Sequence, residues 1–419
     1  MKTVAFNLMP YKDLPADFEK KYDSVWVSIP RTLYDPRKGH EYYHDYLDAL
    51  ETAVDLGYDA VGVNEHHSNG YGLMPSPNLM ASILSRKVRH SDTTSVVVLG
   101  NSLALYNPPI RVAEEMAMLD VLSGGKFIAG FPVGTSMDTN YVYGINPSEM
   151  RERYYEAHDL VMKAWTSDEV FTWNGKYNQL RYVNTWPRTA QRPHPPVWIP
   201  GGGSVETYDF ALLNDYSFSY LSFFGHKYAK KVMGPFWDRA DALGKDRNPY
   251  RAGYAQFICV SETDAQAQID YEEHVKYFFA KCMHIDPRFF EAPGYRTVAS
   301  LRAGLRSQLD GTAKVGKAIL DEGFGWKELV ESGYIIAGSP ETVREQIIEA
   351  ARELHVGNLI WLFHVGSMPQ HLTLKNLHLF AEGVLPHIRN LWPEWDASPF
   401  WPSGFGDDPA QPAARRDVA

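Results

Sequence analysis

The sequence GYDAVGVNEHHSNGYG, residues 57–72, places three adjacent ionisable side chains directly after a short apolar run. The run, residues 58–63, has the length and apolar content of a buried strand, and residues 42–57 before it carry apolar side chains at helical spacing. A helix, a strand and a polar strand end therefore follow one another, the strand end being Glu65, His66 and His67. Strand ends of this kind are where α/β proteins place their functional groups.

The same alternation of strand and helix continues outward in both directions. Further apolar runs of strand length lie at 3–9, 94–102, 126–132, 196–202, 216–221, 254–260 and 357–363. Segments with apolar residues at helical spacing lie at 77–88, 108–125, 148–165, 204–215, 339–354 and 372–388. Strands that are apolar on both faces and alternate with helices predict an α/β protein with a (β/α)8 TIM barrel, and a doubly wound open sheet is the alternative.

Three segments depart from this alternation. Residues 169–180 alternate in polarity around an Asn-Gly pair and predict a β-hairpin. Residues 281–333 form a long insertion, which predicts a lid over the barrel mouth carrying Phe289, Phe290, Tyr295 and Arg296. Residues 396–419 are rich in proline, glycine and charge, and predict an extended or disordered tail after a single domain of residues 1–395.

The composition argues against several classes of protein. The formal net charge is -10 and no block of lysine and arginine occurs, so nucleic acid is not an expected partner. No window approaches the roughly 18 apolar residues of a membrane span, and residues 1–15 lack the pattern of a signal peptide. The two cysteines, Cys259 and Cys282, give no disulfide framework and indicate a reducing, cytoplasmic location.

The Glu65–His66–His67 sequence admits a metal site, a catalytic acid or base, or a histidine pair bonded to loop backbone. A metal site is disfavoured because neighbouring strand residues point to opposite faces, and because the usual i, i+4 ligand pair is absent. In a barrel the residues that follow a strand lie on the catalytic face, so one histidine is expected to point into the mouth. Catalysis and backbone bonding both remain open for that histidine.

Residues 198–211, WIPGGGSVETYDFA, place three glycines between a strand and a helix. Glycine lets the backbone approach a ligand, and the free N–H groups of the helix start, with the hydroxyls of Ser204 and Thr207, form a phosphate cradle. An ordinary helix start capped by Ser204 is the alternative. The chain repeats Gly-Ser-x-Glu-Thr at 338–342 with one glycine before the serine, so the extra glycines favour the first copy.

Two further candidates come from single positions. Asn101 lies in a strand end of small polar residues that suits packing against a planar ring and a hydrogen bond to its edge, and a plain turn is the alternative. Tyr154, on the helix predicted at 148–165, is a candidate for a phosphate contact, and ordinary amphipathic packing is its alternative.

Taken in order, the segments GYDAVGVNEHH, NPPIRVAEEMAMLDVLSGGKFIAG, RERYYEAHDLVMKAW, PHPPVWIPGGGSVET and GSPETVREQI resemble the bacterial luciferase-like flavin-dependent monooxygenases. The resemblance implies a TIM barrel that binds reduced FMN, or in some branches a deazaflavin. It implies that the phosphate lies at the Gly203–Ser204–Thr207 cradle. It further implies that the isoalloxazine ring lies beside Asn101 and that its reactive edge lies near His66.

The resemblance also implies a reaction. A separate reductase would supply reduced FMN, O2 would add to it as a hydroperoxide, and a small organic substrate, apolar or ring-containing, would be oxygenated. His66 would donate or accept a proton at the flavin edge. Hydride transfer from a deazaflavin, and a non-catalytic flavin-binding or partner subunit, are the alternatives. A homodimer through barrel helices is also implied.

One position departs from the family pattern. An arginine near the phosphate is expected after the fourth strand, and Val133 stands there. The phosphate charge would then have to be met by Tyr154, Arg151 or Arg153.

Overall fold

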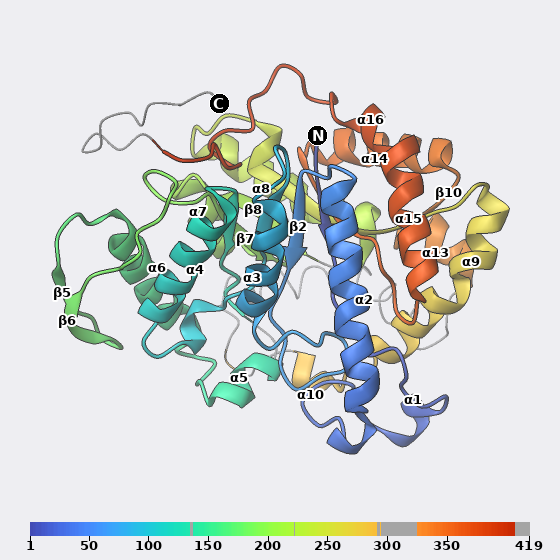
Figure 1. Ribbon diagram of the computed structural model, residues 1–419, viewed down its shortest axis with the longest axis horizontal. Helices are drawn as coiled ribbons and strands as arrows, with labels where there is room; N and C mark the ends of the chain where they lie inside the picture. Colours follow the sequence, from blue (N-terminus) through green and yellow to red (C-terminus); the bar gives the residue numbers. More distant parts are fainter. Residues whose placement is uncertain (135–136, 222, 291–293, 295–324, 407–419) are drawn as a thin grey trace.

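The computed structural model describes residues 1–134, 137–221, 223–290, 294 and 325–406 (Figure 1). Within them, parallel strands close into a barrel in the order β1 (Lys2–Phe6), β2 (Ala60–Val63), β3 (Ser95–Val98), β4 (Phe127–Gly130), β7 (Val197–Gly201), β8 (Ser217–Tyr220), β9 (Ala252–Val260) and β11 (Asn358–Leu362). Closure comes from the pairing of β8 with β9 and of β11 with β1. The predicted (β/α)8 TIM barrel is confirmed, and the open-sheet alternative is wrong.

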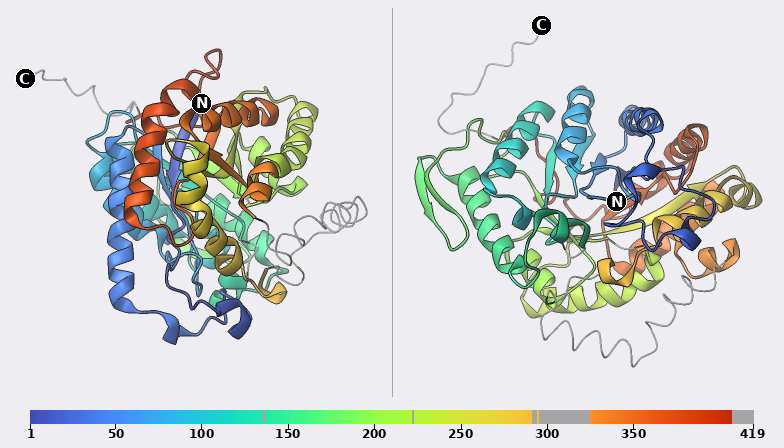
Figure 2. Two further views of the ribbon diagram at one scale, coloured as in Figure 1. Left: turned by 90° about the vertical axis from the view of Figure 1, so that its right-hand side faces the viewer. Right: turned by 90° about the horizontal axis from the view of Figure 1, so that it is seen from below.

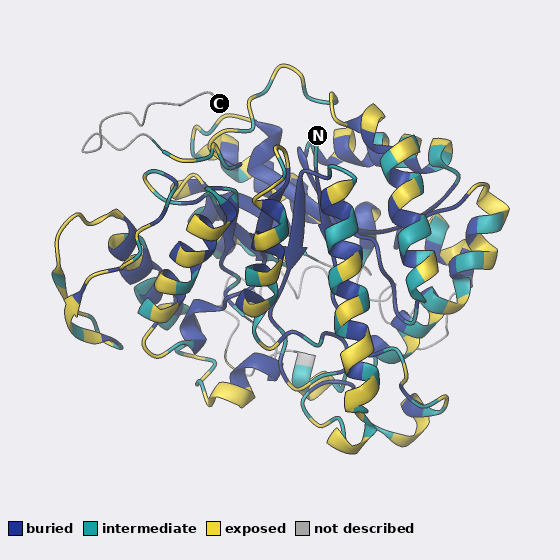
Figure 3. Cartoon of the chain, in the orientation of Figure 1, coloured by how far each residue is buried: buried dark blue, intermediate teal, exposed yellow. Residues whose placement is uncertain are grey.

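Helices surround the barrel and cover its outer face (Figure 1, Figure 2). The main ones are α2 (Pro36–Asp55), α3 (Pro77–Val88), α4 (Ile110–Ser123), α6 (Met150–Thr166), α7 (Val205–Leu213), α8 (Gly225–Ala242), α9 (Asp264–Tyr277), α14 (Pro340–Leu354) and α15 (Gln370–Gly383). β2, β3, β4, β8, β9 and β11 are buried along their whole length, whereas the helices are exposed on their outer faces (Figure 3). This is the burial pattern of parallel strands covered by helices.

The predicted hairpin is present, as β5 (Phe171–Asn174) and β6 (Gln179–Val183). The carboxylate of Glu156 on α6 accepts the backbone N–H groups of Tyr177 and Asn178 at 2.9 and 2.7 Å, which ties the hairpin turn to the barrel. The strand β10 (Ile335–Gly338) was not predicted. It pairs with the second half of β9, beyond the residues of β9 that pair with β8.

The amino ends of the strands are closed by residues 396–406. Nε1 of Trp401 donates to Oδ1 of Asn358, and Nε1 of Trp198 donates to the carbonyl of Phe400, both at 2.8 Å. Trp401 and Phe400 are buried. This part of the predicted tail has no helix or strand and is packed against the barrel. Residues 407–419 lie outside the described residues.

The carboxyl ends of the strands open toward α5 (Met137–Tyr143) and α10 (Pro287–Phe290), at the lower edge of Figure 1. Of the insertion predicted as a lid, the structure describes the end of the π-helix η4 (Phe278–Cys282), α10 and α13 (Trp326–Glu331). The ring of Phe289 lies 6.2 Å from that of Tyr141 on α5. Tyr295 and Arg296 lie outside the described residues, so the lid remains a prediction. No helix in the described ranges is long and apolar enough to cross a membrane.

Candidate active site

His66 and His67 bond to different carboxylates at the end of β2. Nδ1 of His66 lies 2.9 Å from Oδ2 of Asp138, whereas Nε2 of His67 lies 2.8 Å from Oε1 of Glu65. The side chain of Asp138 is fully buried, and that of His66 is 16% exposed. His67 is buried. His66 is therefore the histidine that remains accessible at the barrel mouth.

Asp138 reaches His66 from α5, across the mouth of the barrel. Its Oδ2 also accepts from Nδ2 of Asn69 at 3.3 Å and from the backbone N–H of His67 at 3.4 Å. An ionised carboxylate only accepts hydrogen bonds, so it selects the His66 tautomer with a proton on Nδ1. The Nε2 atom of His66 is then left to accept or donate a proton.

Glu65 is the centre of a buried network that joins the ends of β2 and β3. Its Oε2 accepts the backbone N–H of Ser102, and its Oε1 accepts the hydroxyl of Tyr106, both at 3.0 Å. The side chain of Glu65 is only 2% exposed. Burial and this carboxylate raise the pKa of the Tyr106 hydroxyl, so the hydroxyl stays protonated and donates.

Asn101 extends the network toward the barrel mouth. It is fully buried, and its Nδ2 donates to the Tyr106 hydroxyl oxygen at 3.0 Å. Its Oδ1 has no hydrogen-bond partner among the residues that the structure describes, and neither has Oδ1 of Asn64 at the end of β2. An unmade hydrogen bond of a buried polar atom costs about 1–3 kcal/mol. These two amide oxygens are suited to accept from a ligand.

Aromatic rings enclose His66. The ring centroid of Tyr71 lies 4.6 Å from that of His66, and that of Trp26 lies 6.2 Å from it. Tyr71 packs in turn against Phe223 and Phe278, at 5.6 and 6.1 Å. Walls of this kind bury flat or apolar molecules.

The predicted cradle lies at residues 202–204, between β7 and α7. Ser204 caps α7: its Oγ accepts the backbone N–H of Thr207 at 3.3 Å and lies 3.0 Å from the Thr207 Oγ1. Gly203 has φ +94°, and a Cβ there would lie 2.6 Å from a neighbouring hydroxyl, so glycine is required. Gly202 is exposed, and among the residues that the structure describes a Cβ there would meet nothing within 4 Å. Within the described ranges, the space before the helix is therefore open.

The second copy of the motif, at the start of α14, is filled by the chain itself. Ser339 caps α14 through the backbone N–H of Thr342, as its counterpart does in α7. The carboxylate of Asp264 accepts from the Ser339 backbone N–H at 2.7 Å and from the Thr342 hydroxyl at 3.2 Å. A Cβ on Gly338 would lie 2.4 Å from this carboxylate. The start of α14 thus already holds an anion, and the start of α7 can accept one from outside.

Tyr154 and Val133 lie close to the end of β4. The Tyr154 hydroxyl is buried and donates to the carbonyl of Phe131 at 2.7 Å, so a phosphate contact would require this bond to be exchanged. The Tyr154 contact remains a prediction. The side chain of Val133 is buried, and its carbonyl accepts from the Ser102 hydroxyl at 2.8 Å.

The two arginines considered for the phosphate lie on opposite faces of α6. Arg153 stacks over the ring of Tyr177 in the β5–β6 turn, with 4.3 Å between the guanidinium carbon and the ring centroid. Arg151 lies one helical turn before Tyr155, whose ring packs against Phe210 of α7 at 5.2 Å. By helical spacing, Arg151 lies on the same face of α6 as Tyr155, the face that packs on α7.

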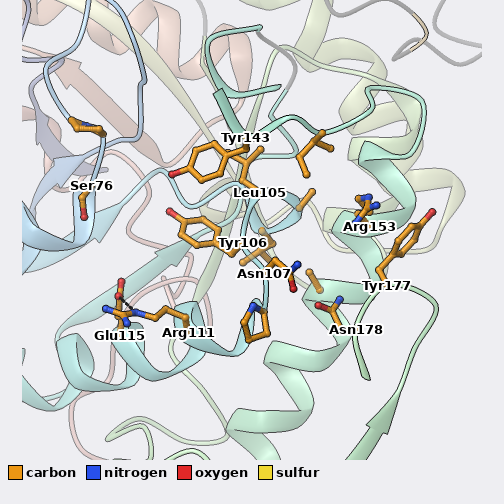
Figure 4. Close-up of a pocket in the computed structure, with 16 residues that line it drawn as sticks. Ser76, Leu105, Tyr106, Asn107, Arg111, Glu115, Tyr143, Arg153, Tyr177 and Asn178 are labelled. Atoms are coloured by element: carbon orange, nitrogen blue, oxygen red, sulfur yellow. Dashed lines mark hydrogen bonds and ion pairs between the residues drawn. The ribbon is translucent and has the colours of Figure 1, made fainter. Parts of the chain in front are cut away.

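A cavity of about 770 Å³ lies beside this network, outside the barrel mouth. Its walls come from η2 (Leu103–Leu105), α4, α6 and the hairpin turn. Figure 4 shows Tyr106 and Tyr143 on one side of it, and Arg153 and Tyr177 on the other. Tyr106 lines this cavity with its ring while its hydroxyl bonds Glu65. Neither His66 nor the α7 cradle lines the cavity.

Comparison with known proteins identifies the family. Residues 24–356 match the family described as luciferase-like monooxygenase. The chain belongs to the luciferase-like monooxygenases. Among solved structures it is similar in fold to the oxygenating constituent of 3,6-diketocamphane monooxygenase from Pseudomonas putida, in complex with FMN. That comparison has a TM-score of 0.67 and 18% identity and covers 93% of this chain and 98% of the other.

Three further proteins are similar to this chain in sequence. An uncharacterised Sinorhizobium fredii protein, y4wF, is 36% identical over 38% of this chain and 44% of its own length. The oxygenase component of the flavin-dependent trigonelline monooxygenase of Acinetobacter baylyi is 25% identical over 58% of this chain and 66% of its own length. The limonene 1,2-monooxygenase of Rhodococcus erythropolis is 24% identical over 82% of this chain and 81% of its own length. The chain thus matches less than two thirds of the length of the first two.

Deazaflavin enzymes have the same fold. An F420-dependent secondary alcohol dehydrogenase has a TM-score of 0.60 and 17% identity, and the comparison covers 93% of this chain and 99% of the other. This likeness shows the shared barrel alone.

The structure brings His66, Asn101 and the glycine cradle to one end of the barrel, because all of them follow strands that run in parallel. It also adds two residues that sequence reasoning missed. Asp138 and Tyr106 follow β4 and β3 at a distance of several residues, in segments with no clear periodicity. Their position downstream of barrel strands is the signal that could have found them.

Proposed function

We propose that this luciferase-like monooxygenase oxygenates a small organic substrate, using O2 and reduced FMN supplied by a separate reductase. The assignment of FMN is supported by the fold neighbour that contains it and by the flavin-dependent relative described as an oxygenase component. The observation that carries the proposal is the contrast between the open start of α7 and the filled start of α14.

The residues present fit a flavin mononucleotide. The cradle formed by Gly203, Ser204 and Thr207 offers backbone N–H groups and hydroxyls to a phosphate at the positive end of a helix. Oδ1 of Asn101 is a buried acceptor that suits an N–H group of the isoalloxazine ring. Of the three residues that could meet the phosphate charge, we propose Arg151, because it shares with Tyr155 the face of α6 that packs on α7.

When bound, reduced FMN supplies the two electrons that allow one oxygen atom of O2 to enter the substrate and the other to leave as water. His66 holds or moves a proton through Nε2, with its ring oriented by Asp138, a role typically worth about 10²–10⁴-fold in rate. Trp26 and Tyr71 pack against His66, and Phe223 packs behind Tyr71; with flavin and substrate bound, this wall would keep water from the reacting groups.

The substrate class follows from the walls of the mouth. Apart from the Asp138 carboxylate, the neighbours of His66 include two aromatic rings, those of Trp26 and Tyr71. A wall of this kind favours an apolar or ring-containing molecule over a charged, strongly hydrated one.

A homodimer is part of the proposal, and the barrel helices α3 and α4 provide its surface. They lie side by side on the outside of the barrel (Figure 1), and together they expose Leu79, Ile83, Met118, Val121 and Leu122. A two-fold axis through this patch would bury it against the same patch of a second copy.

The alternative with a deazaflavin shares the barrel and the phosphate cradle but requires no O2. The non-catalytic alternative is disfavoured by the Asp138–His66 pair, because a binding subunit has no need of a histidine oriented by a buried carboxylate. The cofactor therefore has to be tested directly.

The test is an anaerobic titration of the protein with reduced FMN and, separately, with reduced F420. We expect tight binding of reduced FMN, and about 10–100-fold weaker binding in the Ser204→Ala, Thr207→Val double variant. The matched control is Ser339→Ala with Thr342→Val, which changes the same motif where Asp264 fills it. Equal affinity of the wild type and both double variants, or tighter binding of reduced F420, would contradict the proposal.

A further inference from the structure

We infer that Glu65 and Tyr106 are positioning residues, which set the orientation of the Asn101 amide so that its oxygen faces the bound flavin. The inference rests on the proposed function and deepens it, because it gives a role in flavin binding to two residues that the proposed function leaves without one. Two hydrogen bonds, from Tyr106 to Glu65 and from Asn101 to Tyr106, fix the orientation of the amide.

The direction of each bond is fixed by the one before it. The carboxylate of Glu65 has no proton to give, so the Tyr106 hydroxyl must donate to it. The hydroxyl proton is then used, and the Tyr106 oxygen can only accept from Asn101. An accepting oxygen requires the NH2 group of Asn101 on the side of Tyr106. The amide oxygen must therefore lie on the other side.

The carboxylate that begins this chain is held from several sides. Oε2 of Glu65 accepts the backbone N–H of Ser102 at 3.0 Å, and Nε2 of His67 lies 2.8 Å from Oε1. A Cβ on Gly100 would lie 2.4 Å from the backbone nitrogen of Glu65, so the ends of β2 and β3 approach more closely than another residue would allow. This close approach brings the backbone N–H of Ser102 within reach of the carboxylate.

The end of the chain is an acceptor without a partner. Asn101 is fully buried, and its Oδ1 has no hydrogen bond within the described ranges. The arrangement presents an acceptor, not a donor, at the place where the sequence predicts the edge of the ring. A flavin ring N–H matches an acceptor, whereas a flavin carbonyl would require the amide in the opposite orientation.

The competing explanation is that the network only holds two loops together. Both explanations predict weaker flavin binding when Tyr106 is changed, so affinity of the single variant does not separate them. They differ in how the effect of Tyr106 depends on Asn101. A residue that acts through the Asn101 amide loses its effect once that amide is absent, and a residue that supports the loops does not.

The experiment is a double-mutant cycle, read by anaerobic titration with reduced FMN. The proteins are the wild type, Tyr106→Phe, Asn101→Ala and the double variant. Thermal unfolding of each protein is measured in parallel. Tyr143→Phe is the matched control, because Tyr143 lines the same cavity wall and packs on His67 at 5.1 Å, while its hydroxyl takes no part in the network among the described residues.

We expect Tyr106→Phe and Asn101→Ala each to weaken binding by about 10-fold, and the double variant to bind within about 2-fold of Asn101→Ala. Glu65→Gln, whose amide can donate to Tyr106 and so reverse the chain, is expected to match Tyr106→Phe. Tyr143→Phe should bind as the wild type does. A double variant weakened by the product of the two single effects would overturn the inference while leaving the proposed function intact. A wild-type protein that does not bind reduced FMN would overturn both.

Discussion

The imidazole of His66 and the carboxylate of Asp138 meet across the barrel mouth, with 2.9 Å between Nδ1 and Oδ2. One partner follows β2, and the other belongs to α5. Asp138→Asn keeps the size of the side chain but allows an NH2 group to face Nδ1, which would favour the other tautomer of His66. We expect turnover to fall on the order of 10²-fold, with the dissociation constant of reduced FMN changed by less than about 3-fold.

The matched measurement for this prediction is single-turnover kinetics at saturating reduced FMN and O2. His66→Ala should be at least as slow as Asp138→Asn. A rate that is unchanged in both variants would remove the proton-handling role, and a loss confined to flavin affinity would assign the pair to binding.

The phosphate prediction separates two arginines that are neighbours in sequence. Arg151→Met is expected to weaken the binding of reduced FMN by about 10–100-fold, because a charged hydrogen bond to phosphate contributes roughly 1.5–3 kcal/mol. Arg153→Met is the control, since Arg153 stacks on Tyr177 and pairs with Glu149 on the opposite face of α6. Isothermal titration measures both. Equal losses of affinity in the two variants would show that Arg151 makes no specific contact with the phosphate.

The proposed dimer predicts a change of molecular mass. A lysine introduced at Ile83 of α3 or Met118 of α4 would be buried at the interface without a partner, and we expect the dimer dissociation constant to rise by at least about 30-fold. Light scattering during size exclusion measures the mass. Ile269→Lys, which changes an exposed apolar residue of α9, is the control. A monomeric wild type would rule out the dimer. Dimers in every variant would place the interface on another surface.

Residues 396–406 pack against the barrel, so we expect a single substitution there to lower stability strongly. Trp401 is buried against Trp198 and donates to Asn358, so Trp401→Ala should lower the free energy of unfolding by about 3–5 kcal/mol. Phe405 is 70% exposed, and Phe405→Ala should change the free energy of unfolding by less than about 0.5 kcal/mol. Denaturant unfolding distinguishes the two, and equal small effects would mean that the tail does not support the barrel.

The buried His364, which follows β11, is expected to make the folded protein less stable as the pH falls. Burial, together with the nearby Lys12 ammonium, holds the pKa of His364 well below 6.5. As the pH falls below 6.5, the unfolded chain binds a proton at this residue that the folded chain does not, so stability falls by up to about 1.4 kcal/mol per pH unit. Above that pH the residue is neutral in both states and has no effect.

The check on His364 is the free energy of unfolding at pH 7 and pH 5. His364→Gln should lose less stability between the two than the wild type does. The exposed His371→Gln is the control. A variant that loses as much as the wild type would show that other groups govern the acid sensitivity.

The barrel could be predicted because its signals are local. Each of the apolar runs that form the closed barrel is short, bounded by polar residues and followed by a helix in most cases, so periodicity alone places it. α8 was missed because Gly234 and Pro235 interrupt its pattern, although the helix continues through them. α9 was missed because its buried residues, such as Ala267 and Val275, are few and its remaining positions are polar.

The site was predictable only in part, for a related reason. His66 and Ser204 stand at strand ends, and the topology alone brings them to one face. The Asp138–His66 contact joins residues 72 positions apart. It depends on how α5 folds back over the mouth, and no periodicity in either segment encodes that contact. The difference between the two Gly-Ser-x-Glu-Thr motifs likewise appears only when Asp264 is seen at the second one.

Labelled oxygen tests the proposed oxygenation directly. The wild-type protein, reduced FMN and 18O2 are incubated with a panel of monoterpenes, cyclic ketones and nitrogen heterocycles, and the products are analysed by mass spectrometry. We expect a product that carries one 18O atom, that forms only with reduced FMN, and that His66→Ala does not form. An unlabelled product formed in the absence of O2, with reduced F420 as the hydride donor, would contradict the proposed oxygenation.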